Sequence, residues 1–307
     1  EVQRRGSSRV FIVTGKTLNR KTPLIGQLTQ ALGDRFVGCF DACIEHTPRR
    51  TVMEAARAVR SASPDLIVTV GGGTAIDTVK VLLIALAEGL EHEDELSNWH
   101  LAVNPDGSRR LPKVKSPPMR QIAISTTLSA AEFSNLGGCT DETRKVKDAY
   151  MGEEIGPATV ILDPKASLYT PSWLWLSTGL RALDHAIEGL CSISPSPLIH
   201  ALGLEAVRLL TNGLRQSHRD PEDLEARLDC LQGAWLSGIA IMRVPFGARH
   251  GIGHSLGAVT GMSHGYTSCI MLPNVMRFNV EKTQSMQSLI AKAMGRILMR
   301  QMLFQSL

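Results

Sequence analysis

Long apolar runs are missing from this sequence. The longest, VLLIALA at residues 81–87, is too short to cross a bilayer, and the opening EVQRRGSSRVF has no apolar segment of the kind that a secretory signal contains. The six cysteines form no CxxC pair, which is typical of reduced thiols that fill a core. We therefore expect a cytoplasmic protein with no membrane partner.

Concentrated charge is also missing. The formal net charge is only +4, and no basic run is longer than the pairs Arg49-Arg50 and Arg109-Arg110. A nucleic-acid-binding protein usually gathers its basic residues on one stripe, so we expect no nucleic-acid partner. Apolar residues make up 43% of the chain and charged residues 20%, which is enough material for a globular core.

The order of apolar patterns divides the chain into two parts. Short apolar runs at residues 9–15, 65–73, 120–127 and 158–164 are typical of buried strands, and helical patterns at 51–62 and 74–89 separate some of them. Strands that alternate with helices predict a Rossmann-like parallel sheet of the α/β class. The polar, Pro-rich residues 97–118 indicate a loop. After residue 166 only helical patterns remain, so we expect an α/β domain at residues 1–163 and an all-helical domain at 164–307.

Three successive glycines, Gly71, Gly72 and Gly73, lie between a predicted strand and a predicted helix. Glycines let backbone amides approach a phosphate closely, and the N-terminus of a helix adds a favourable dipole. A tight turn without a ligand also fits, because Thr74 and Asp77 have the spacing of a capping box. Phosphate binding is the preferred interpretation.

The first predicted strand ends in VTGKT, which places Lys16 directly after Gly15. An NAD site usually presents an acid to the ribose 2′-hydroxyl, whereas an NADP site lacks that acid and has a cation nearby. The Gly15-Lys16 pair favours NADPH on this basis. An exposed lysine in a turn explains the same pattern equally well, so both NADH and NADPH stay open.

Histidines gather in GARHGIGHSLGAVTGMSHG, residues 247–265. His250 and His254 are four residues apart and share a helix face, and His264 follows ten residues later. Three of the nine histidines within fifteen residues indicate a site. An HxxxH pair is a common metal-binding pattern, and such pairs also serve in proton transfer.

Several motifs occur in a characteristic order: GGGTAIDTVK, TTLSAAEFS, VILDP, RALDHAIEG and HGIGHSLGAVTGMSHGYTSCIMLPNVMRFN. Together they resemble the iron-containing alcohol dehydrogenase family, with its dehydroquinate synthase-like fold, over residues 9 to about 296. TTLSAAE is most similar to the maleylacetate reductase branch. The resemblance implies a nicotinamide cofactor, a dinucleotide-binding domain followed by a helical domain, and a homodimer. It places Thr74 in the pyrophosphate loop and puts five further residues near the nucleotide: Thr126, Thr127, Ser129, Glu132 and Lys147.

The same resemblance locates the metal ligands of metal-using members, which are an aspartate and a histidine on one helix and two later histidines. In this sequence those positions are Arg181, His185, His250 and His264, and His254 matches a histidine near the substrate. A guanidinium stays protonated and opposes a bound Fe²⁺ or Zn²⁺. A metal-free site is therefore favoured, although Arg181 pointing away from the site is an alternative.

Two acids near this helix position do not replace the missing aspartate. Asp184 and Glu188 lie three residues after Arg181 and His185 respectively. We expect Asp184 on a solvated helix surface and Glu188 in a structural hydrogen bond. Arg181 itself suits a small-molecule carboxylate, because its planar fork binds a carboxylate bidentately.

These residues predict hydride transfer from NAD(P)H to the C=C of an unsaturated keto acid. Arg181, His185 or His250 would stabilise the developing enolate, and His254 would donate the proton.

Two alternatives stay open. One is a metal-dependent alcohol or aldehyde dehydrogenase that binds Fe²⁺ or Zn²⁺ through His185, His250 and His264. The other is a non-redox or inactive family member. The chain begins close to its first predicted strand and ends in AKAMGRILMRQMLFQSL, which differs from the family's continuation, so we expect a truncated or atypical C-terminus.

Overall fold

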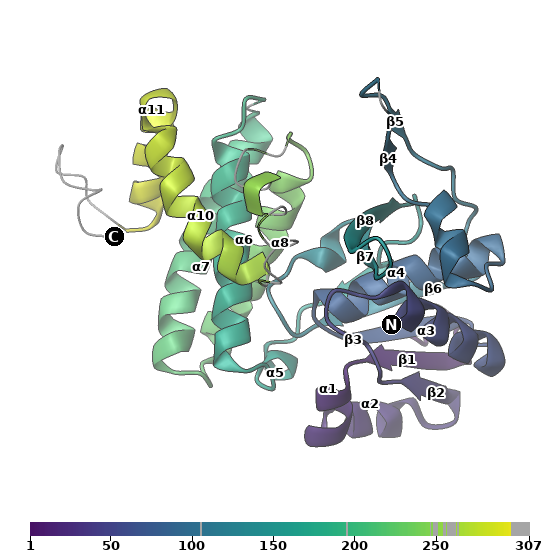
Figure 1. The fold of residues 1–307 in the computed structure, drawn as a ribbon. Helices are drawn as coiled ribbons and strands as arrows, with labels where there is room; N and C mark the ends of the chain where they lie inside the picture. Colours follow the sequence, from purple (N-terminus) through teal and green to yellow (C-terminus); the bar gives the residue numbers. More distant parts are fainter. Residues whose placement is uncertain are drawn as a thin grey trace. The chain divides into compact units, whose positions relative to one another are not determined.

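Five parallel strands form the main sheet, in the order β2-β1-β3-β6-β9 (Figure 1). The structure, a computed structural model, describes residues 1–104, 106–194, 196–245, 247, 251–253, 256, 262 and 264–295. Apolar runs predicted four of the five strands, and they did not reveal β2, whose residues are only half-buried at the sheet edge. The parallel sheet confirms the predicted α/β class. The strands are β1 (Val10–Thr14), β2 (Phe36–Phe40), β3 (Leu66–Gly71), β6 (Arg120–Ser125) and β9 (Thr159–Ile161).

Both faces of this sheet are covered, as strand β1 shows. Val10 and Ile12 belong to an apolar cluster with residues of α2, whereas Phe11 and Val13 belong to a second cluster with α3 and α4. Successive side chains of a strand point to opposite faces, so a continuous apolar run implies burial on both sides. The helices of this part are α1 (Lys16–Lys21), α2 (Leu24–Leu32), α3 (Arg49–Ala62), α4 (Gly73–Glu88) and α5 (Pro164–Ser167).

Two small antiparallel ladders lie outside the main sheet. Strands β7 (Leu136–Asp141) and β8 (Val146–Met151) form a hairpin, which packs through the buried Cys139 and Tyr150 into the same cluster as α3 and α4. Strands β4 (Ala102–Val103) and β5 (Arg109–Arg110) form a two-residue ladder in the region predicted to be a loop. Three 3-10 turns complete this part: η1 (Gly33–Arg35), η2 (Glu93–Asn98) and η3 (Ala131–Phe133).

In the described part of the chain after residue 170, every regular element is a helix, as the sequence predicted. Helices α6, α7 and α8 contact one another, α10 packs on α6, and α11 packs on α7. Glycines permit close approach at these contacts, because a Cβ at Gly213 would lie 2.7 Å from the carbonyl oxygen of Ala226. The helices are α6 (Ser172–Leu190), α7 (Pro197–Arg219), α8 (Leu224–Ile241), α10 (His264–Phe278) and α11 (Val280–Ala293).

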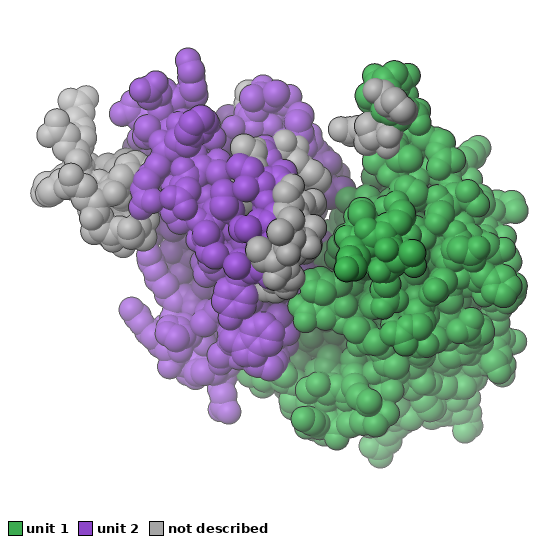
Figure 2. Space-filling model, viewed as in Figure 1, with its two compact units in different colours: residues 1–126, 131–169 green, residues 127–130, 170–307 purple. Residues whose placement is uncertain are grey.

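The chain divides into two compact units, coloured separately in Figure 2. Residues 1–126 and 131–169 make the first unit, and residues 127–130 and 170–307 make the second. The four residues 127–130, which follow β6 in the sequence, thus belong with the helices, whereas the sequence analysis assigned them to the first domain.

Candidate active site

The glycine loop joins strand β3 to helix α4. Gly71 has a φ of 151°, and a Cβ on it would lie 3.2 Å from the Cβ of Ala75, so this position favours glycine. Gly72 is the N-cap of α4, with no side-chain cap. The alternative of a capping box with Thr74 as N-cap and Asp77 at N3 is therefore wrong, since the N-cap lies two residues earlier at Gly72. The amides of this first turn have no capping side chain, which fits the pyrophosphate of a dinucleotide.

An acidic residue that the sequence analysis missed, Asp41, lies beside the end of β1. Gly15 pairs with Ala42 in an isolated bridge, and Asp41 directly follows β2. The Asp41 carboxylate accepts hydrogen bonds from Arg20 Nε at 2.9 Å and from Asn19 Nδ2 at 3.0 Å. These two bonds, with a smaller contribution from Lys16, lower its pKa. The NADPH preference assumed that no acid lies near Gly15, and that assumption is wrong.

The signal for Asp41 was present in the sequence. FVGCF at residues 36–40 is a short apolar run, and an acid follows it immediately. The run was not recognised as a strand, so its end could not be placed beside the first strand. In parallel dinucleotide-binding sheets an acid at the end of the second strand contacts the adenosine ribose.

The segment after β6 is tied to the glycine loop by its backbone. The Thr126 amide donates a 3.0 Å hydrogen bond to the carbonyl oxygen of Gly71. Thr126 and Glu132 belong to the first unit, whereas Thr127 and Ser129 belong to the second. The Glu132 carboxyl is buried, and burial raises its pKa, while a hydrogen bond from the Ser125 hydroxyl acts in the opposite direction. The structure thus places the Thr126 backbone against the glycine loop.

Lys147 projects from strand β8 and is exposed. Its side chain runs along the backbone of Gly138 on the neighbouring strand β7, where a Cβ would collide with Lys147 Cε. Gly138 is opposite Ala149 in the ladder, and Lys147 pairs with Thr140. The glycine is what allows the Lys147 side chain to follow this path.

Helix α6 holds the arginine–histidine pair. Trp175 anchors the helix, because its Nε1 donates a 3.0 Å hydrogen bond to Ser217 Oγ of α7, and the Arg227 guanidinium stacks 4.6 Å above its ring. Arg181 is half-buried and His185 is buried, one turn apart on this helix. Asp184 has no exposed surface at all, so the expectation of a solvated Asp184 is wrong.

Of the three remaining predicted histidines, only His264 lies within the described residues. His250 and His254 lie outside the described residues. His264 is the first residue of α10, and nothing is described of its side chain. Its neighbour Gly265 lies against the backbone of Ser177, where a Cβ would be 2.8 Å from the Ser177 carbonyl oxygen. Helix α10 therefore begins against α6, the helix that carries His185.

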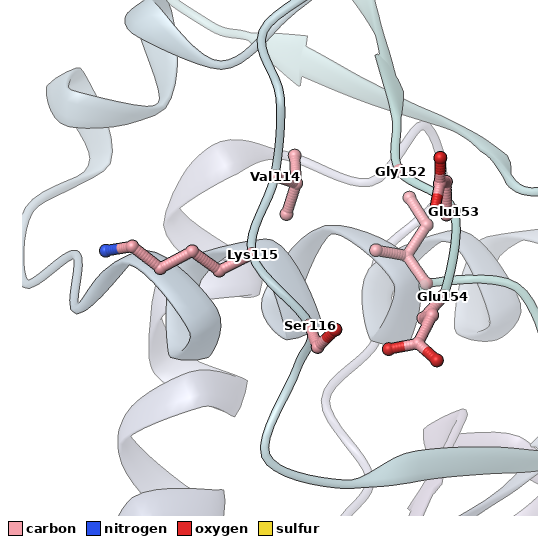
Figure 3. A pocket seen from close by; sticks show the side chains of 7 residues that line it. Val114, Lys115, Ser116, Gly152, Glu153 and Glu154 are labelled. Atoms are coloured by element: carbon pink, nitrogen blue, oxygen red, sulfur yellow. The ribbon is translucent and has the colours of Figure 1, made fainter.

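A small cavity in the first unit is lined by residues 114–116 and 152–155, and by none of the predicted site residues (Figure 3). Glu153 and Glu154 lie on one side of it, and the Lys115 ammonium points away, to within 3.2 Å of Glu88 Oε2. Its walls show no arrangement suited to a dinucleotide.

Comparison with known proteins identifies the family. Residues 1–164 match the family described as iron-containing alcohol dehydrogenase, and residues 175–303 match the Fe-containing alcohol dehydrogenase family, C-terminal. The chain belongs to the iron-containing alcohol dehydrogenase family. It is therefore an oxidoreductase of a family whose members use nicotinamide cofactors and often contain iron.

Three relatives illustrate the range of this family. Dehydrogenase ALT3 of Alternaria alternata is 32% identical over 295 residues, which cover 89% of this chain and 73% of that protein. Maleylacetate reductase 1 of Rhodococcus opacus is 28% identical and covers 96% of this chain and 72% of its own. The crystal structure of maleylacetate reductase from Agrobacterium tumefaciens is 26% identical, with a TM-score of 0.77, over 95% of this chain and 73% of that chain.

The metal that the family's name implies can be tested against the described residues. In that part of the chain, no three His, Cys, Asp or Glu side chains gather closely enough to hold an ion. The described part of the predicted ligand set is the imidazole of His185 with the cationic Arg181 one turn away. A protonated guanidinium beside this imidazole would oppose a divalent cation. Separately, no described helix is long and apolar enough to cross a membrane.

Proposed function

We propose that this family member is an NAD(P)H-dependent reductase that transfers hydride to the C=C of an unsaturated keto acid without a metal ion. Maleylacetate, the substrate named for several relatives, is such an acid. One observation carries the proposal: Arg181 is half-buried one turn before the buried His185 on α6, where metal-using members have an aspartate. A guanidinium recognises a carboxylate through two parallel hydrogen bonds, so this position suits a small-molecule acid better than an ion.

The cofactor would bind across the first unit's glycine loop. Gly71, Gly72, Gly73 and Thr74 would receive the pyrophosphate, since α4 begins there with uncapped amides. Further contacts are assigned to Gly15, Lys16, Thr126, Thr127, Ser129, Glu132 and Lys147. When bound, the reduced nicotinamide supplies the hydride.

The chain's own residues would control charge and protons during the reduction. Hydride would form a new C–H bond at the carbon β to the carbonyl; the C=C π pair would shift to join the α-carbon to the carbonyl carbon, and the C=O π pair would move onto the oxygen to give the enolate. Arg181 would hold the substrate carboxylate, and with His185 and His250 would stabilise the negative enolate oxygen. His254 would return a proton to the α-carbon, because an imidazole titrates near neutral pH.

Asp41 supports NADH as the preferred cofactor. Its carboxylate lies at the end of β2, where an acid of a dinucleotide-binding sheet accepts a hydrogen bond from the ribose 2′-hydroxyl. The 2′-phosphate of NADPH would be repelled by the negative charge of Asp41. Arg20 and Lys16 reduce the repulsion, so the preference is expected to be moderate.

The deciding experiment is turnover of maleylacetate by chelator-treated protein, followed through the loss of reduced-nicotinamide absorbance. NADH and NADPH are tested separately, each without metal and with added Fe²⁺ or Zn²⁺. Turnover without metal supports the proposal. Turnover of maleylacetate that requires added metal overturns the metal-free mechanism, and an absence of turnover under every condition overturns the proposed reaction.

A metal-dependent alcohol dehydrogenase is the second candidate, and the family's own description favours it. In that case His185, His250 and His264 would bind the ion, and Arg181 would have to turn away from it. Bound iron or zinc in the purified protein, with alcohol oxidation that a chelator abolishes, would select this function.

A further inference from the structure

Thr178, on helix α6, holds a loop of the second unit through its side-chain hydroxyl. The backbone amide of Leu128 donates a 3.2 Å hydrogen bond to Thr178 Oγ1. The same hydroxyl donates to the carbonyl oxygen of Leu174, one turn earlier on α6, at 2.7 Å. Because it donates on one side and accepts on the other, the hydroxyl has a fixed orientation towards the loop.

The side chain of Leu128 packs on the same helix. It is fully buried, and a Cβ at Gly179, the residue after Thr178, would lie only 3.0 Å from Leu128 Cδ1. A larger residue than glycine would therefore press against the leucine. Both the backbone and the side chain of Leu128 are thus anchored at one point of α6.

The anchored loop is a short excursion of the chain. Residues 127–130 belong to the second unit, whereas the residues before and after them belong to the first (Figure 2). Ala130, at the end of the loop, has a positive φ of 61°. Such a conformation is costly for a residue other than glycine and persists only where surrounding contacts impose it. The anchor at Leu128 is a contact of this kind.

The anchor lies on the face of α6 that carries the proposed substrate residues. Arg181 and His185 follow the anchoring threonine by three and seven residues, so the three side chains share one face of the helix. The residues on either side of Leu128, Thr127 and Ser129, are proposed cofactor contacts. One helix face therefore carries the residues assigned to the keto acid and also holds the loop assigned to the cofactor.

We propose that Thr178 is a positioning residue that sets the loop 127–130 relative to Arg181, and so aligns the nicotinamide with the substrate for hydride transfer. This inference rests on the proposed function. Thr178 is assigned no contact with either reactant. Valine has nearly the shape of threonine but no acceptor, so Thr178→Val would leave the Leu128 amide without its partner. The loop could then shift, and a displacement of about 1 Å can lower a rate by about 100-fold.

The test compares Thr178→Val and Thr178→Ser with Ser237→Ala, a control from helix α8. Ser237 is fully buried, and its hydroxyl donates to the Ala234 carbonyl of its own helix. Steady-state kinetics use NADH and maleylacetate, and thermal unfolding checks that each variant is folded. We expect Thr178→Val to lower kcat about tenfold or more while the KM for maleylacetate stays within about threefold, because Arg181 keeps its place on the helix. Thr178→Ser and the control should keep kcat within about threefold, because the hydroxyl that holds the loop remains.

Hydrogen exchange without cofactor or substrate tests the anchor itself. Exchange in residues 127–130 should rise in Thr178→Val and stay normal in Thr178→Ser and in the control. Normal exchange in Thr178→Val refutes the anchor, and raised exchange with an unchanged kcat refutes its link to catalysis. Should Thr178→Val fail to fold, Thr178→Ala removes the same acceptor and takes its place. If the unmodified chain reduces maleylacetate with neither NADH nor NADPH, it is the proposed function that fails, and the exchange result still decides the anchor.

Discussion

The carboxylate of Asp41 lies 2.9 Å from the guanidinium Nε of Arg20, at the carboxyl end of strand β2. The pairing leaves an acid and a base side by side next to Gly15, at the edge where a parallel dinucleotide-binding sheet receives the adenosine ribose. The acid would favour a ribose with two free hydroxyls, and the base would tolerate a phosphate. Which of the two dominates decides between NADH and NADPH.

Replacing the acid should change that preference. In Asp41→Asn we expect the ratio of kcat/KM for NADH to that for NADPH to fall roughly tenfold, because a charged hydrogen-bond acceptor and its repulsion of a phosphate are both lost. Asp34→Asn, an exposed acid on the turn before β2, is the matched control and should leave the ratio unchanged. An unaltered ratio in Asp41→Asn would remove Asp41 from the cofactor site.

Arg181 should act on the substrate's carboxylate. Both Arg181→Lys and Arg181→Ala are expected to raise the KM for an unsaturated keto acid about tenfold or more, because lysine cannot supply a planar fork. Steady-state kinetics on folded variants measure this. Arg208→Ala, which removes an exposed arginine on α7, serves as the control. A normal KM in Arg181→Ala would mean that the guanidinium points elsewhere.

Restoring the aspartate should restore a metal site. Arg181→Asp places a carboxylate one turn before His185, in the pattern of the metal-using members, and removes a cation that opposes the ion. We expect this variant to retain iron or zinc after dialysis, while the unmodified chain retains much less. Elemental analysis of both proteins checks the expectation, and equal metal contents would contradict it.

The sequence predicted best where one physical pattern dominated. The apolar runs of β1, β3 and β6 have buried side chains on both faces of the sheet, and glycines mark the ends of β1 and β3, at Gly15 and Gly71. Strand β2 was missed because its half-buried edge position gives a weaker apolar signal. Asp41 was missed with it, since its role depends on which strands are neighbours.

The hairpin β7–β8 was not recognised in the sequence, for a different reason. Its sequence contains adjacent glycines and many charges, features that normally indicate a loop. What stabilises it is non-local, namely Arg49 of α3, which pairs with Asp141 and Asp148 across about a hundred residues of sequence. The burial of Asp184 was equally invisible, because helix periodicity alone does not reveal which helices pack against α6.

Arg49 should matter strongly for stability. Its side chain is only 6% exposed and lies 2.8 Å from both Asp141 Oδ2 and Asp148 Oδ2. Arg49→Met leaves two buried carboxylates with Arg144 as their remaining arginine partner, and should cost about 3 kcal/mol of unfolding free energy. The neighbouring Arg50→Met, at an exposed position, should cost about 0.5 kcal/mol or less. Urea unfolding of the two variants provides the comparison, and equal costs would contradict the buried network.

The same network predicts how stability depends on pH. Hydrogen bonds from the Arg144 amide and guanidinium, with the charge of Arg49, lower the pKa of Asp141 from 3.8 to about 2. A lowered carboxyl pKa means that the unfolded chain takes up the proton first. The contribution of Asp141 is therefore complete above pH 3.8 and is lost as the pH falls towards 2.

Asp141→Asn removes that titration. The variant should be less stable than the unmodified chain at pH 5, and its unfolding free energy should fall less steeply on acidification. Urea unfolding at several pH values between about 5 and 3 measures both slopes, since the difference in proton uptake sets each of them. Asp94→Asn, an exposed acid on η2, should reproduce the slope of the unmodified chain. Parallel slopes for Asp141→Asn and the unmodified chain would mean that Asp141 gains nothing from Arg49 and Arg144, and the hairpin would then have to be held by its apolar contacts alone.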